Sequence, residues 1–201
     1  MNESERRASV SRETTETTIT VELNIDGEGR AEIATGIGFF DHMLDAFARH
    51  GRFDLNVSCD GDLQIDAHHT MEDVALAVGT AFDEALGDRA GIVRMADATV
   101  PLDEALVQVV VDISGRPYSA VSFDFAGERI GEAPSEMVGH VIQSFAVGGR
   151  LTLHVTQIAG ANDHHTAEAA MKALGRAMDA ATRSDGRIAG RVPSTKETLT
   201  T

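Results

Sequence analysis

The chain has 201 residues and a formal net charge of −15. So acidic a protein is a poor match for nucleic acids or anionic membranes, which bind basic surfaces. It also shows no apolar run approaching the ~18 residues of a membrane span and no secretory signal near the N-terminus. The single cysteine, Cys59, allows no internal disulfide and indicates a reducing compartment, so we expect a cytoplasmic protein.

The first half of the chain predicts strands that alternate with two helices. Residues 15–25 alternate polar and apolar side chains, which is typical of a half-buried strand, and a glycine-rich turn follows. Apolar side chains at helical spacing then predict a helix over residues 39–50. The remaining elements expected in this half are strands over residues 31–35, 53–59 and 63–66, and a helix over residues 68–86.

The second half repeats this pattern, with strands expected over residues 105–113, 118–125 and 151–158 and a helix over residues 164–182. We therefore predict an α+β fold of two duplicated ββαββα halves, 1–100 and 101–201, which form one globular unit. Each half would contribute a four-stranded, largely antiparallel sheet, and the helices would pack between the two sheets. Residues after Arg183 are expected to form a loose tail.

A duplicated histidine motif opens the last helix of each half. His68, His69 and Glu72 recur 96 positions later as His164, His165 and Glu168. On a helix the first histidine and the glutamate share a face, so each pair forms a two-ligand chelate, whereas the second histidine points about 100° away. Each second histidine could therefore serve the metal of the other copy.

Two further histidines fit the duplication. His42 precedes the first motif and His140 precedes the second at similar distances, so each half offers three histidines and one glutamate. A single helical histidine is more often a hydrogen-bonded structural residue, but the joint pattern favours two metal sites. The order of residues differs from the HExxH motif of zinc peptidases.

Five sequence blocks together resemble the imidazoleglycerol-phosphate dehydratase family, and the resemblance extends from about Arg6 to Lys196. They occur in the family's order and cover independent parts of the chain. The blocks are residues 35–44 (TGIGFFDHML), 66–73 (DAHHTMED), 114–118 (SGRPY), 162–168 (NDHHTAE) and 193–196 (PSTK).

The resemblance implies dehydration of D-erythro-imidazole glycerol phosphate to imidazole acetol phosphate in histidine biosynthesis. It also implies two Mn²⁺ ions per site and an assembly of 24 identical chains with sites shared between them. Carried onto this sequence, one metal would bind His42, His68, Glu72 and His165, and the other would bind His69, His140, His164 and Glu168.

The same resemblance assigns catalytic roles to Glu16, His42, Glu72 and Glu168. Metals on the substrate's ring nitrogens would make the imidazole an imidazolate-like electron donor and acceptor, and loss of hydroxide would pass through a diazafulvene-type intermediate. Glu16 matches the family's N-terminal glutamate and would be the base. From the residues alone, the default interpretation of Glu16 is a solvated charge on an edge strand.

Residues that match the family's substrate contacts supply cations and hydroxyls for the phosphate. They are Glu16, His50, Arg94, Arg116, Ser194, Thr195 and Lys196. One departure weakens a contact, because Ala46 stands where the family often has a glutamine that helps to hold the phosphate.

Lysine is scarce: only Lys172 and Lys196 are found among the 17 basic residues. An acidic, lysine-poor surface is typical of proteins from a high-salt cytoplasm, although an ordinary acidic protein is the alternative.

Two other functions also remain open from the residues alone, a binuclear metallohydrolase and a non-catalytic metal-storage shell. An assay for the acetol-phosphate product separates all three.

Overall fold

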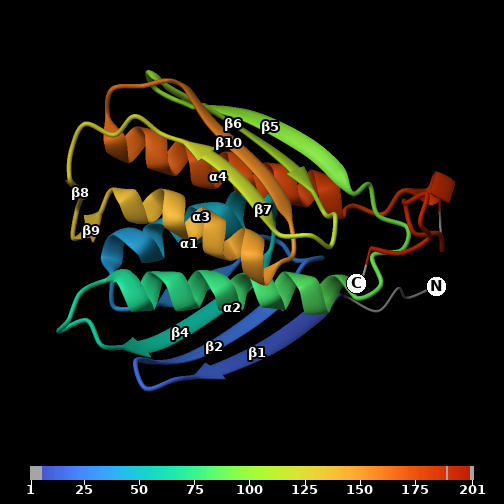
Figure 1. Cartoon of the computed structure of the whole chain (residues 1–201), viewed down its shortest axis with the longest axis horizontal. Coiled ribbons are helices and arrows are strands. Elements are labelled where there is room, and N and C mark those ends of the chain that lie inside the picture. Colours follow the sequence, from blue (N-terminus) through green and yellow to red (C-terminus); the bar gives the residue numbers. More distant parts are fainter. Residues whose placement is uncertain (1–5, 189, 200–201) are drawn as a thin grey trace.

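Two four-stranded sheets enclose four helices in the computed structural model, which describes residues 6–188 and 190–199 (Figure 1). The helices lie between the sheets, so the apolar face of each sheet is covered by helices and its other face is left outside. This arrangement confirms the predicted α+β class with helices between two sheets.

The first sheet has the strand order β1-β2-β4-β3 and is covered by helices α1 and α2. Alternation places Ile19, Val21 and Leu23 of β2 on its buried face. β3 runs parallel to β4, whereas the other neighbours are antiparallel. The elements are β1 (Arg7–Glu13), β2 (Thr17–Asn24), β3 (Ala31–Ala34), β4 (Asp54–Gly61), α1 (Gly38–Gly51) and α2 (His68–Leu86).

The second sheet has the order β5-β6-β10-β7, again with one parallel pair, β7 with β10, and is covered by α3 and α4. A short hairpin, β8 (Arg129–Ile130) with β9 (Ala133–Pro134), precedes α3. The other elements are β5 (Met95–Leu102), β6 (Ala105–Asp112), β7 (Tyr118–Ser122), β10 (Thr152–Ala159), α3 (Glu136–Gly148), α4 (Asp163–Thr182) and the 3₁₀ turn Gly186–Ile188.

The duplication is preserved in strand register up to a β-bulge in β10, between Gln157 and Ala159. Arg7 pairs with Asn24 in the first sheet, and the residues 88 positions later, Met95 and Asp112, pair in the second. The pairing of Asn24 with Asp54 recurs as Asp112 with Thr152, which lies 98 positions after Asp54. Equivalent residues in the two halves can therefore be identified from their place in each sheet.

Helix α1 packs against α4, and α2 packs against α3, so each helix contact joins the two halves. Two equivalent glycines allow the close approach. A Cβ on Gly79 would lie 2.4 Å from the carbonyl oxygen of Phe145, and a Cβ on Gly175 would lie 2.4 Å from that of Phe47. Because neither crossing leaves room for a side chain, the two glycines fix the position of α1 along α4 and of α3 along α2.

The order of strands differs from the predicted ββαββα pattern. Each half has three sheet strands, a helix, a fourth sheet strand and a helix, because residues 7–13 form β1 and residues 63–66 form a turn; the second half adds the β8–β9 hairpin before α3. Strand β1 lies at a sheet edge and only Ala8 and Val10 are half-buried, so its sequence lacks a strong apolar alternation. Leu63 and Ile65 are exposed, so their apolar character does not mark a buried strand.

The boundary that we expected at residues 100 and 101 falls inside β5, and a division before Met95 keeps each sheet within one half. The C-terminal tail is fixed by Arg89, whose fully buried guanidinium pairs with Asp83 and donates to the carbonyl oxygen of Leu199 at 3.1 Å. No helix in the described part of the chain combines the length and the apolar character that a membrane crossing requires.

Candidate metal centres

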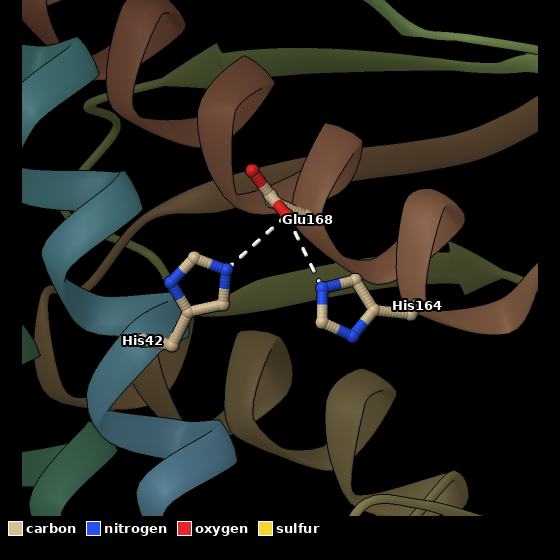
Figure 2. Close-up of side chains that lie close together, drawn as sticks. All are labelled: His42, His164 and Glu168. Carbon is tan, nitrogen blue, oxygen red and sulfur yellow. Dashed lines mark hydrogen bonds and ion pairs between the residues drawn. The ribbon is translucent and has the colours of Figure 1, made fainter.

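Two clusters of metal-ligating side chains lie at the helix contacts between the halves. Triad A consists of His42 on α1 and His164 and Glu168 on α4 (Figure 2). The Nε2 atoms of His42 and His164 lie 3.2 and 3.3 Å from Oε2 of Glu168, and the two rings are 5.7 Å apart. Both histidines therefore point their Nε2 atoms at one carboxylate oxygen.

Triad B is the equivalent cluster on the other helix pair. It consists of His68 and Glu72 on α2 and His140 on α3. Nε2 of His68 lies 3.4 Å from Oε2 of Glu72, and Nε2 of His140 lies 3.5 Å from Oε1. The chain thus carries the same three ligand types twice, each time from two helices that belong to different halves.

The donor sets fit divalent metal ions. Bonds of about 2.0–2.2 Å place adjacent ligands of one ion roughly 3 Å apart, close to the observed separations of 3.2 to 3.5 Å. In triad B, Nε2 of His140 is buried without a hydrogen-bond partner, an arrangement that a metal ion would satisfy. Three ligands per triad leave coordination positions for further groups.

Local capping explains why both histidine pairs stand at a helix start. Oδ1 of Asp66 accepts a hydrogen bond from the backbone N–H of His68, and Oδ1 of Asn162 accepts from those of His164 and His165. These side chains occupy equivalent positions and satisfy N–H groups that lack a partner in the first helical turn. Each motif therefore begins the helix whose face presents its chelate.

The third histidines are exchanged relative to our expectation. We placed His42 with His68 and Glu72, and His140 with His164 and Glu168, but within one chain each joins the other chelate. The reason is that α1 packs on α4 and α3 packs on α2. The similar spacings of 26 and 24 residues between each third histidine and the chelate of its own half favoured the expected pairing, but spacing along the chain does not reveal which helices pack together.

The second histidines, His69 and His165, belong to neither triad of their own chain within the described residues. Each ring is held through Nδ1: His69 lies 3.0 Å from Oδ2 of Asp62, and His165 lies 2.8 Å from Oε2 of Glu104. These hydrogen bonds raise the pKa of both imidazoles, against a smaller opposing effect of burial. The predicted divergence of the paired histidines is confirmed.

Lys172 is a site residue that our interpretation of the sequence missed. Its Nζ lies 2.6 Å from Oε1 of Glu168, one helical turn earlier. Burial raises the pKa of Glu168, but the hydrogen bonds from Lys172 and His42 outweigh it, and the pKa is lowered. The i,i+4 spacing and the scarcity of lysine were the available signals.

His50 lies near the same cation. Burial lowers its pKa, and the charges of Lys172 and Arg176 lower it further. This part of α1 and α4 therefore gathers cationic groups beside triad A, in a protein whose net charge is −15. Ala46, which replaces the expected glutamine, is buried in α1 and offers no polar contact.

The remaining residues that we expected to bind phosphate lie at the end of the molecule that is farther from the triads. Arg94 donates to Asp112 at 2.7 Å and to the carbonyl oxygen of Pro193 at 2.6 Å, so it holds the tail that carries Ser194, Thr195 and Lys196. Arg116 lies in the turn before β7. In Figure 1 the tail lies opposite the starts of α2 and α4, where the triads are.

Glu16 lies in the β1–β2 turn, on the triad side of the chain. Its Oε2 is 3.7 Å from Nδ1 of His69, and its side chain is about half exposed. The structure therefore brings the expected base to the histidine motif of α2 while leaving it accessible.

Comparison with known proteins assigns this arrangement to a family. The sequence pattern of imidazoleglycerol-phosphate dehydratase matches residues 35–178. The chain is 55% identical over 199 residues to the imidazoleglycerol-phosphate dehydratase of Roseiflexus sp. (strain RS-1), covering 99% of this chain and 100% of that protein. It is also 55% identical over 194 residues to that of Chloroflexus aurantiacus, covering 96% and 95%.

Solved structures agree with the sequence comparison. The structure of the enzyme from Pyrococcus furiosus in complex with (S)-C348 superposes with a TM-score of 0.82 and 37% identity, covering 94% of this chain and 100% of that one. That of the Staphylococcus aureus enzyme gives a TM-score of 0.81 and 33% identity, covering 89% and 99%. The chain therefore belongs to the imidazoleglycerol-phosphate dehydratase family, the metal-dependent lyases (EC 4.2.1.19) that act in histidine biosynthesis.

Proposed function

We propose that the chain dehydrates D-erythro-imidazole glycerol phosphate to imidazole acetol phosphate with two Mn²⁺ ions per active site, one at triad A and one at triad B. The observation that carries the proposal is the pair of equivalent His-His-Glu clusters. Imidazole alone suits several divalent metals, and the carboxylate in each triad shifts the preference toward Mn²⁺. We infer that His69 and His165 of neighbouring chains complete the two coordination shells.

Metals held by triads A and B would supply Lewis acidity to the substrate's imidazole and so acidify its protons. The chain's own contribution is a base that removes a proton from the carbon skeleton. Glu16 fits this role because its carboxylate is exposed and lies beside His69, a ligand that we place on the metal. Its two oxygens are not part of either triad within the described residues, so Glu16 is free to accept a proton.

For the phosphate, we propose that two groups of cations from different chains meet. Lys172 contacts triad A and His50 lies near Lys172, whereas the tail that carries Ser194, Thr195 and Lys196 lies at the opposite end of the molecule (Figure 1). Arg116 lies beside that tail, because its neighbour Gly115 closely approaches the carbonyl oxygen of Leu199. Three of the five N–H groups of Arg94 bind Asp112 and Pro193, so Arg94 mainly positions the tail. A complete site would then require the tail of a neighbouring chain.

Assembly follows from the same two gaps. Among the described residues, neither the second histidines nor the tail reaches the triads of its own chain, so we propose a homo-oligomer with sites between chains. The 24-chain assembly implied by the family resemblance is the form that we propose. We further propose that the protein functions in a cytoplasm of high salt concentration, which its charge of −15 and its two lysines favour.

The decisive experiment measures product and metal on one preparation. Protein purified without chelator should contain close to two metal ions per chain and should form imidazole acetol phosphate from imidazole glycerol phosphate. Release of inorganic phosphate would instead indicate a metallohydrolase, and metal without turnover would indicate a storage protein. His164→Ala, which removes one ligand of triad A, should lower the metal content toward one ion per chain.

A further inference from the structure

The duplication places a second glutamate at the position of Glu16. Glu16 lies in the β1–β2 turn, and Glu104 lies 88 residues later in the β5–β6 turn, at the same place in the repeated strand register. Each of these glutamates faces the second histidine of its own half, but at different distances. Oε2 of Glu16 is 3.7 Å from Nδ1 of His69, whereas Oε2 of Glu104 is 2.8 Å from Nδ1 of His165.

The difference arises in the segment that links the last strand of each half in chain order, β4 or β10, to the helix that follows it. In the first half, Asp62 follows β4 and its Oδ2 lies 3.0 Å from Nδ1 of His69. In the second half a β-bulge between Gln157 and Ala159 shifts the register, so Gly160 is the equivalent of Gly61, and the equivalent of Asp62 is Ala161, whose side chain has no polar atom. Glu104 therefore takes the place beside His165 that Asp62 takes beside His69.

The two carboxylate oxygens of Glu104 have separate partners. Oε1 accepts hydrogen bonds from the backbone N–H groups of Ala161 and Asn162, at 3.3 and 2.8 Å, while Oε2 faces the imidazole. Both backbone donors hold Oε1 in place, so the orientation of the carboxylate is fixed by the loop before α4. A fixed acceptor beside Nδ1 favours the tautomer that carries its proton there.

We propose that Glu104 is the positioning residue of His165: it holds the Nδ1 proton and so presents the Nε2 lone pair to a metal, as Asp62 does for His69. The two halves have thereby diverged. Because Asp62 orients His69, Glu16 is not needed for that role and is available as a base. Glu104, in contrast, orients His165. This inference rests on the proposed function, in which His165 and His69 are metal ligands.

Glu104→Gln tests the proposal because the backbone donors dictate how the amide must lie. Its oxygen must replace Oε1 to accept from Ala161 and Asn162, so its NH₂ group faces Nδ1 of His165. An amide donor there forces the ring proton onto Nε2, which can then no longer bind a metal. We expect the folded variant to bind Mn²⁺ at one of its two sites about 10- to 100-fold more weakly, measured by electron paramagnetic resonance of free Mn²⁺.

Two isosteric variants serve as controls. Asp103→Asn removes the neighbouring charge, 4.0 Å from Nε2 of His165, and should leave Mn²⁺ affinity unchanged. Glu16→Gln changes the equivalent residue of the other half and should also leave it unchanged. A Glu104→Gln protein with two sites of normal affinity would overturn the proposal, and so would an equal loss in either control.

A second measurement needs no variant. Nitrogen NMR of histidine-labelled, metal-free protein, above the pH range in which imidazole protonates, should show the Nδ1–H tautomer for His165, and an Nε2–H tautomer would contradict the inference. Wild-type protein that binds no Mn²⁺ would instead refute the proposed function itself.

Discussion

Nζ of Lys172 lies 2.6 Å from Oε1 of Glu168, so the carboxylate of triad A is shared with a cation. The equivalent position in the other half, 96 residues earlier, is Leu76, and Glu72 of triad B has no such partner among the described residues. Glu136 lies instead in the cavity beside His68 and His140, where it adds negative charge. The two triads are therefore unequal in their electrostatic surroundings.

This inequality predicts two affinities for Mn²⁺. A fixed positive charge repels the metal, and its hydrogen bond occupies one oxygen of Glu168, so triad A should bind more weakly than triad B. Lys172→Met should raise the weaker affinity on the order of tenfold and leave the stronger one unchanged. Isothermal titration calorimetry of metal-free protein with Mn²⁺ measures the affinities of both triads.

The only other lysine provides the control. Lys196 is exposed in the tail and, in the proposed site, faces the substrate phosphate and not the metals, so without substrate Lys196→Met should leave the two Mn²⁺ affinities as they are in the wild type. A single affinity for both wild-type sites, or an equal effect of the two lysine variants, would disprove the difference between the triads.

A second prediction separates the base from the metal ligands. If Glu16 removes the proton, Glu16→Gln should lower turnover by roughly 10²- to 10⁴-fold while metal content and oligomer size stay normal. Glu72→Gln should lower metal content as well, because Glu72 is a member of triad B. Metal analysis and steady-state kinetics on the same samples distinguish the two effects, and near-normal turnover of Glu16→Gln would exclude it as the base.

A third prediction concerns the tail. Arg89 is fully buried between Asp83 and the carbonyl oxygens of Gly149 and Leu199, so Arg89→Met leaves Asp83 with only Arg150. We expect a loss of about 3–5 kcal/mol of stability and a lower melting temperature. Arg187→Met breaks the exposed pair with Asp185 and should cost less than about 1 kcal/mol. Equal melting temperatures at equal protein concentration would contradict this.

The chemistry of the site was readable from the sequence to a large extent. The repeated His-His-x-x-Glu pattern predicted both helices, the shared face of His68 with Glu72, and the divergence of His69, because these follow from helical geometry alone. The four-stranded sheets were also predictable from alternation in strands such as β2 and β6.

What could not be predicted depends on packing between distant segments. His42 joins His164 because Gly175 lets α1 approach α4 closely, and a glycine in the sequence does not indicate which segment will pack against it. Glu104 reaches His165 because the β5–β6 turn lies over the start of α4, a relationship between residues 61 positions apart. Strand β1 was not predicted because an exposed edge strand needs few apolar side chains.

A fourth prediction tests adaptation to salt. Repulsion among the excess carboxylates opposes folding and assembly at low ionic strength, and added salt screens it. With a net charge of −15, the gain from screening should exceed the loss of attractive surface ion pairs. The melting temperature should therefore rise as KCl is increased toward molar concentrations, and a melting temperature that falls with KCl would remove the argument for a high-salt cytoplasm.

The last prediction concerns assembly. His69 and His165 are held by carboxylates through Nδ1 and point away from the triads of their own chain, so a metal that binds them also binds another chain. Metal removal then deletes contacts between subunits, and mass action shifts the equilibrium toward smaller oligomers. Light scattering during EDTA treatment should show the particle losing mass together with activity, and Mn²⁺ should restore both. A particle that loses its metal but keeps its full mass would show that other contacts hold the chains together.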